Sequence, residues 1–70
     1  MITKCENGNL VDHWYDRSRR ESVTQVLDPV GNQIGDALYA GCRITAHSNR
    51  QAAIRKNGGP LVIKHKSSSK

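Results

Sequence analysis

The alternation of apolar and polar side chains near the N-terminus predicts two short β-strands joined by a tight turn. The pair Asn7–Gly8 is a dipeptide that two-residue hairpins prefer, because both residues readily take positive φ. It separates a strand over about residues 2–6 from a second strand over residues 10–16. Trp14 is expected in the core, because one Trp in so small a protein is usually its largest buried surface.

Two further strands are predicted on either side of a turn. Residues 22–27 contain β-branched side chains, which favour an extended chain. Residues 28–32 read Asp-Pro-Val-Gly-Asn, where Asp caps the turn, Pro presets φ and Gly or Asn accepts positive φ. The fourth strand covers residues 33–40, and Gly35 inside it predicts a bulge or a close approach of another backbone.

Residues 45–57 have the only helical pattern in the chain, with Thr45 or Ser48 suited to the N-cap. The glycines and proline of residues 57–60 predict its end, because glycine supplies a left-handed cap and proline cannot continue a helix. The apolar stripe expected to pack against the sheet consists of Ala46, Ala53 and Ile54, while Arg50, Arg55 and Lys56 are expected to face outward.

The fold class that follows is α+β, with elements in the order β-β-β-β-α-β. A last strand is predicted over residues 61–65, and residues 66–70 are predicted to be a disordered polar tail. We expect one antiparallel sheet with the helix packed on one of its faces, forming a single domain over residues 1–65. Leu, Ile, Val and Phe supply only 14 of the 70 residues, so the core should be small and its stability modest.

The charges are distributed unevenly along a chain whose net charge is +5. All six acidic residues lie within residues 1–36, whereas the charged residues of 37–70 are all basic. Such a segment favours a polyanionic partner, since Lys and Arg that neutralise phosphates release condensed counterions. The alternative is that these bases only keep the protein soluble. The predicted contacts to nucleic acid or another polyanion are Arg43, Arg50, Arg55, Lys56, Lys64 and Lys66.

A secondary contact is predicted where the second strand leads into an arginine-rich turn. Trp14 and Tyr15 precede this turn, and aromatic rings beside arginines can stack on bases and grip phosphates. Alternatively, Trp14 is core, Tyr15 is a half-buried strand residue, and the arginines belong to a solvated loop. Asp16 and Glu21 flank the turn and would partly neutralise it. The predicted secondary contacts are Tyr15, Arg17, Arg19 and Arg20.

The sequence predicts no enzymatic activity, no cofactor and no metal. Ser, His and Asp are present, but no nucleophile lies in a recognisable catalytic motif. The histidines His13, His47 and His65 and the thiols Cys5 and Cys42 lack the short spacings of metal-binding motifs. Any metal ligands would have to converge through tertiary structure.

A cytoplasmic location is expected, with no contact to a membrane. Residues 1–6 lack the apolar run of a signal peptide, and no segment reaches the roughly 20 apolar residues of a membrane span. In that compartment Cys5 and Cys42 would stay reduced, and a single disulfide between them is the alternative.

The run from Trp14 to Asn57 resembles, in layout, the integrase arm-binding and plant-type AP2 DNA-binding domains. The similarity consists of three strands with an arginine turn, the pattern Asp28-Pro29-Val30-Gly31, and a following Ala-containing helix. It implies a three-stranded sheet that enters the DNA major groove and is backed by the helix. The chain departs from that plan in an extra strand after the helix and in its strand residues Thr24, Gln25, Gln33 and Asp36. The ending also resembles short uncharacterised bacterial and phage proteins.

Two functions are therefore considered. The first is a non-catalytic accessory protein that binds DNA or RNA and is encoded by a phage or another mobile element. The second is a small inhibitor or adaptor that docks on an acidic surface of a larger protein complex. An edge strand at residues 1–6 or 61–65 would suit strand addition by a partner, or a homodimer.

Overall fold

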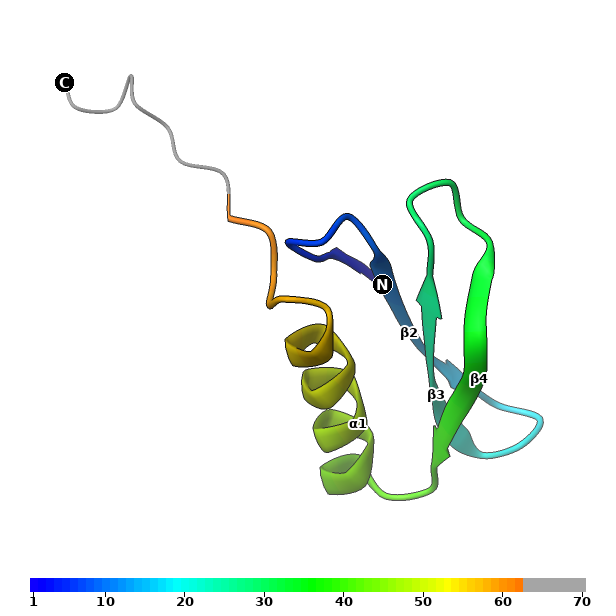
Figure 1. Cartoon of the computed structure of the whole chain (residues 1–70). Helices are drawn as coiled ribbons and strands as arrows, with labels where there is room; N and C mark the ends of the chain where they lie inside the picture. Colours follow the sequence, from blue (N-terminus) through cyan, green and yellow to red (C-terminus); the bar gives the residue numbers. More distant parts are fainter. Residues whose placement is uncertain (63–70) are drawn as a thin grey trace, which may run out of the picture.

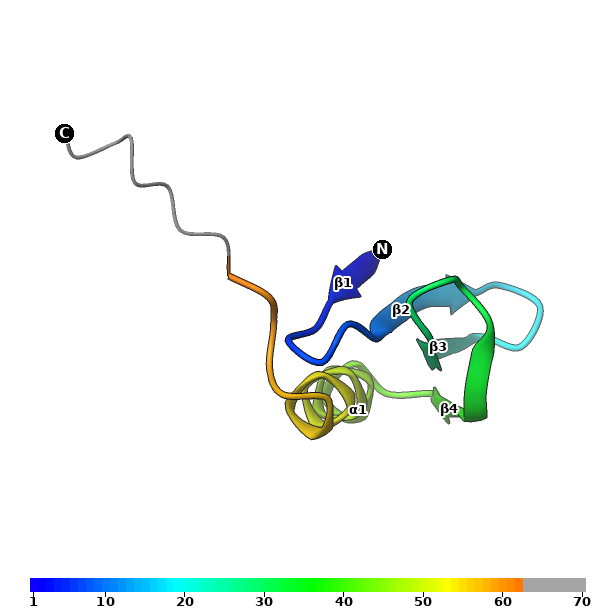
Figure 2. The same ribbon diagram turned by 45° about the horizontal axis from the view of Figure 1, so that its top comes forward.

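The computed structural model describes residues 1–62 and contains an antiparallel four-stranded sheet followed by one helix (Figure 1). The strands lie side by side in the order of the sequence, and the helix packs along one side of the sheet (Figure 2). This architecture confirms the predicted α+β fold class. The elements are β1 (Ile2–Lys4), β2 (Leu10–Asp16), β3 (Glu21–Leu27), β4 (Gln33–Ala40) and α1 (Arg43–Lys56).

Only residues 61 and 62 of the predicted last strand (61–65) are described, and neither belongs to a strand. Pro60 forms an antiparallel bridge with Cys5, and the backbone N–H of Leu61 donates to the carbonyl of Lys4 at 2.8 Å. The chain thus returns from α1 to the end of β1. Residues 63–65 of that predicted strand and the predicted disordered tail, residues 66–70, lie outside the described residues.

The core lies between α1 and the middle of the sheet. Cys5 and Val11 are fully buried there and pack with Ala53 and Ile54 of α1. Val26 of β3 lies directly opposite Val11 of β2 and packs against the same cluster. The predicted helical stripe is confirmed by this packing, and burial raises the pKa of the Cys5 thiol.

Strand side chains alternate between two faces of the sheet. We call the face of Val11 and Val26, which packs on α1, the helix-covered face. The opposite face, which carries Trp14, Val23 and Tyr39, is the helix-free face. Trp14 retains 41% of its exposed surface there. The prediction that Trp14 lies in the core is wrong, because the helix packs over the face of Val11 instead.

The connection between β3 and β4 forms as its residue types predict. The Asp28 carboxylate accepts hydrogen bonds from the backbone N–H groups of Val30 and Asn32 at 3.0 and 2.8 Å. These bonds stabilise the ionised form, so the backbone N–H of Asn32 in particular lowers the pKa of Asp28. Further along β4, Gly35 has a φ of 69° where the pairing with β3 shifts register, which confirms the predicted bulge.

The helix begins two residues earlier than predicted, with Cys42 at the N-cap instead of Thr45 or Ser48. As a neutral thiol Cys42 makes no capping hydrogen bond, but the backbone N–H groups of Thr45 and Ile44 lower its pKa because they stabilise a thiolate. At the other end Gly58 has a φ of 92°, as expected for a residue that follows a helix. No helix within residues 1–62 is long and apolar enough to cross a membrane.

The longer free edge of the sheet belongs to β4, and not to the edge strands predicted at residues 1–6 or 61–65. The other edge, β1, is partly covered at its end by the chain that follows α1. There the backbone N–H of Glu6 donates to the carbonyl of Gly59 at 2.9 Å, next to the bridge between Cys5 and Pro60. No described segment pairs with the outer side of β4.

Candidate nucleic-acid interface

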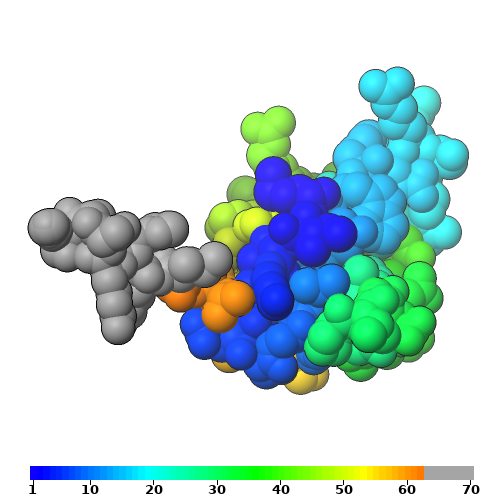
Figure 3. Space-filling model, turned by 90° about the horizontal axis from the view of Figure 1, so that it is seen from above, coloured from blue at the N-terminus to red at the C-terminus, as the bar shows by residue number. Residues whose placement is uncertain are grey.

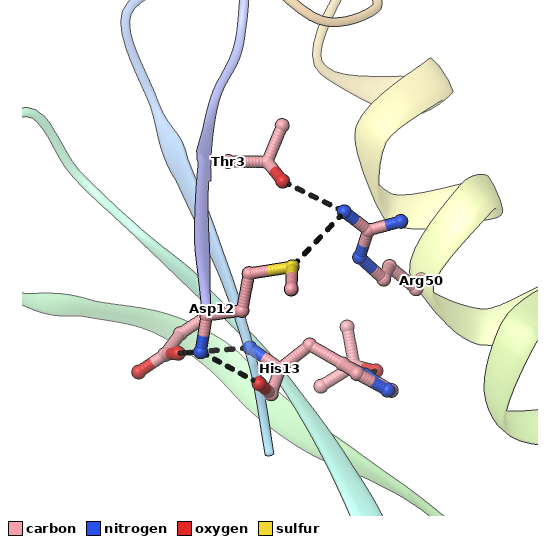
Figure 4. Close-up of polar contacts among 6 residues, drawn as sticks. Thr3, Asp12, His13 and Arg50 are labelled. Carbon is pink, nitrogen blue, oxygen red and sulfur yellow. Dashed lines mark hydrogen bonds and ion pairs between the residues drawn. The ribbon is translucent and has the colours of Figure 1, made fainter.

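One arginine of the predicted helical contact set is tied to the sheet. Arg50 reaches from α1 to β1, where its Nη2 donates to Thr3 Oγ1 at 3.0 Å and contacts Met1 Sδ at 3.8 Å (Figure 4). His13 lies nearby and shares a 3.0 Å hydrogen bond with Thr24 Oγ1. Burial and the positive charge of Arg50 lower the pKa of His13. Arg50 therefore stabilises the contact between α1 and β1 and is not extended into solvent.

The remaining basic residues of α1 point in different directions. Arg43 is in the first position of the helix. Arg55 lines a shallow surface depression together with His47 and Gln51. Lys56 instead lines a groove beside β4 that is also lined by an acidic residue, Asp36. The structure thus does not bring the helical bases into one patch. Lys64 and Lys66 lie outside the described residues.

The arginine-rich turn between β2 and β3 projects from one corner of the molecule (Figures 1 and 3). The Asp16 carboxylate shapes it by accepting hydrogen bonds from the backbone N–H groups of Ser18 and Arg19, at 2.9 and 3.3 Å. Arg20 has a φ of 55°, which tightens the return into β3. Arg17 and Arg20 are exposed, and neither has a carboxylate partner within residues 1–62. They are available to an external anion.

A row of three side chains crosses the helix-free face beside this turn. Trp14 lies opposite Val23, and Val23 lies opposite Tyr39, so the row runs over β2, β3 and β4. Val23 in the middle is only 2% exposed, whereas Trp14 and Tyr39 are 41% and 45% exposed. The guanidinium of Arg19 stacks over the Tyr39 ring at 4.1 Å. We call these three side chains, together with Arg19 over the Tyr39 ring, the aromatic row.

Three carboxylates lie at or near the helix-free face, and each has a local partner. Asp12 faces the N-terminal amine of Met1 at 3.6 Å, and Asp16 accepts the turn amides. Glu21 pairs with Arg19, at 3.3 Å between Oε1 and Nε. These partners reduce the negative charge of the face but do not make it strongly positive. The accessible feature of the face is its aromatic rings.

Tyr15, predicted as a contact together with the arginines, points to the other side of the sheet from Trp14. Its neighbours in the pairing are Ser22 of β3 and, beyond it, Ala40 of β4, on the helix-covered face. The tyrosine that shares a face with Trp14 is Tyr39, which sequence reasoning missed as a site residue. The signal that identifies Tyr39 is the strand register, which depends on the two turns and on the bulge at Gly35.

A second surface feature is a groove of about 530 Å³ between α1 and β4. Val26 forms part of its lining, and the half-exposed side chains Ile34 and Leu38 line it from β4. Ala52 and Lys56 line it from the helix. It borders the free edge of the sheet.

No protein-family model matches this chain, and no curated protein or solved structure matches it either. The resemblance to integrase arm-binding and AP2 domains stays a prediction.

Proposed function

We propose that this protein is a small non-catalytic nucleic-acid-binding protein that uses the arginine-rich turn and the helix-free face. The observation that carries the proposal is that exposed Trp14 and Tyr39 lie on the helix-free face, near the end of the sheet where the turn with Arg17 and Arg20 connects β2 to β3. Exposed aromatic rings interact with bases, and unpaired arginines neutralise phosphates. The contact set differs from the helical one first predicted, because the bases of α1 do not converge.

The proposal predicts a salt-dependent interaction that depends on the turn more than on the helix. Labelled DNA should bind at ~50 mM salt and weaken steeply towards ~200 mM. The double substitution Arg17→Ser and Arg20→Ser should lower the slope of log affinity against log salt by about two, roughly one per lost phosphate contact. Fluorescence anisotropy over a salt series measures both quantities.

The matched control removes the same charge from α1, through Arg43→Ser and Arg55→Ser. Both arginines are exposed, as Arg17 and Arg20 are, and their replacement changes the net charge by the same amount. If the Arg43→Ser and Arg55→Ser variant loses less affinity than the turn variant, the proposed contact set is supported. An equal or larger loss of affinity would assign binding to the basic C-terminal half. Absence of binding to any nucleic acid at ~50 mM salt would reject the function.

The groove between α1 and β4 favours the second candidate, a protein-interaction module. A strand added to the free edge of β4 would place alternate side chains against Ile34 and Leu38. A protein partner should then be captured from lysate after nuclease treatment, and Leu38→Asp should abolish its capture. The exposed helix variant Ile44→Asp is the control. Capture that disappears with nuclease treatment would contradict this second function.

A further inference from the structure

The aromatic row forms one continuous platform on an otherwise open sheet. Neighbouring strands are about 4.8 Å apart, so the backbones at Trp14 and Tyr39 are separated by roughly 10 Å. Val23 lies between them and is nearly inaccessible, which shows that the neighbouring side chains cover it. Arg19 extends the platform, because a guanidinium plane also stacks with bases. Trp14, Tyr39 and Arg19 all remain partly exposed to solvent.

A duplex would gain little from this platform. Its base faces are stacked on one another, and its grooves present only base edges and phosphates. Unpaired bases, in contrast, offer their faces to any aromatic ring.

The arginine-rich turn is placed to hold the backbone of such a strand. It begins just after Asp16, two residues beyond Trp14, which at about 3.3 Å per residue is roughly 7 Å. A base stacked on Trp14 therefore has its phosphate within reach of a long arginine side chain. Arg17 and Arg20 have no internal carboxylate partner in the described part of the chain, which leaves their charges for phosphate.

We infer that the ligand is single-stranded nucleic acid, whose unpaired bases stack on Trp14 and on the stacked pair of Arg19 and Tyr39 while Arg17 and Arg20 hold its phosphates. This inference rests on the proposed nucleic-acid-binding function and narrows it to one class of ligand. In this mode the sheet contacts the faces of unpaired bases, and not the edges of paired bases in a groove.

The chain contains a single Trp, so its fluorescence reports directly on this site. A 12-nucleotide oligo(dT), an oligo(U) of the same length and a duplex of the same length are titrated at ~50 mM salt. Both single strands should quench Trp14 fluorescence and bind at least tenfold more tightly than the duplex. A difference between oligo(dT) and oligo(U) would identify DNA or RNA as the preferred strand.

Substitutions of tyrosine provide a matched pair on opposite faces of the sheet. Tyr39→Leu should weaken single-strand binding roughly 5- to 150-fold, the range for one base–aromatic stack, and should change duplex binding little. Tyr15→Leu, on the helix-covered face, should change neither single-strand binding nor duplex binding. Tyr39→Phe keeps the aromatic ring and should bind single strands as the unchanged protein does. Weak binding by Tyr39→Leu alone would then result from the loss of stacking and not from misfolding.

The outcomes separate the inference from the function on which it rests. Equal or tighter binding of the duplex, without quenching of Trp14, would overturn the single-strand inference and leave nucleic-acid binding in place. Equal effects of Tyr15→Leu and Tyr39→Leu would also overturn it. If none of the three ligands binds at ~50 mM salt, the proposed function itself fails.

Discussion

Replacement of Ile54 by alanine should lower the free energy of unfolding by about 2–5 kcal/mol, the usual range for truncating a buried isoleucine. Ile54 is 5% exposed and packs with Cys5, Val11 and Ala53. Few large side chains are buried within residues 1–62, so the cavity cannot be filled easily by its neighbours. Urea unfolding followed by far-ultraviolet circular dichroism measures the change.

Ile44→Ala is the control for this prediction, because Ile44 lies on the same helix but is 77% exposed. Its replacement should be neutral or stabilise the helix by a few tenths of a kcal/mol, since alanine has the higher helix propensity. Ile54→Val, with an expected loss of about 0.5–1.5 kcal/mol, keeps the measurement possible if the alanine variant is largely unfolded. Equal losses for Ile44→Ala and Ile54→Ala would contradict the burial of Ile54 in the core.

The secondary structure could be predicted from the sequence because turn chemistry marks almost every boundary. Asn7–Gly8 and the turn at residues 28–32 divide the strands, and Gly58 and Gly59 end the helix. Each of these residues acts locally, through positive φ or through a side chain that bonds its own backbone. The start of α1 was missed, since Cys42 is not a preferred N-cap residue.

The face of the sheet that packs on the helix could not be predicted, and this error moved the candidate site. Alternation along β2 shows that Val11 and Trp14 point to opposite faces, but both faces mix apolar and polar residues. The large size of Trp14 favoured the prediction that its face of the sheet is the buried one. In the structure it is Val11 that packs against α1, through Ala53 and Ile54.

The position of the basic residues also required the three-dimensional structure. Residues close in sequence need not share a side of a helix, because each successive residue is rotated by about 100°. Arg50 and Arg55 are five positions apart and so point about 140° away from each other. The interactions of Arg50 with Thr3 and Met1 join residues almost 50 positions apart, which no local pattern indicates.

Asn57→Ala should destabilise the protein by about 3 kcal/mol, because it removes three hydrogen bonds that are each worth about 1 kcal/mol. Asn57 is 8% exposed, and its Oδ1 accepts from Nδ2 of Asn7 at 3.0 Å and from Nδ2 of Asn9 at 2.9 Å. Its own Nδ2 donates to the carbonyl of Ala53 at 2.7 Å. These bonds hold the end of α1 against the first hairpin, next to the core.

Asn49→Ala is the matched control on α1, since Asn49 is half-buried and its side chain makes no hydrogen bond to any residue of 1–62. It should be neutral or slightly stabilising, because alanine is the better helix former. Urea unfolding of both variants compares them directly. A loss for Asn57→Ala no greater than that for Asn49→Ala would show that the asparagine cluster does not hold the helix to the hairpin. The start of the chain and the end of α1 would then be held together by the apolar core and by backbone hydrogen bonds such as that from Glu6 to Gly59.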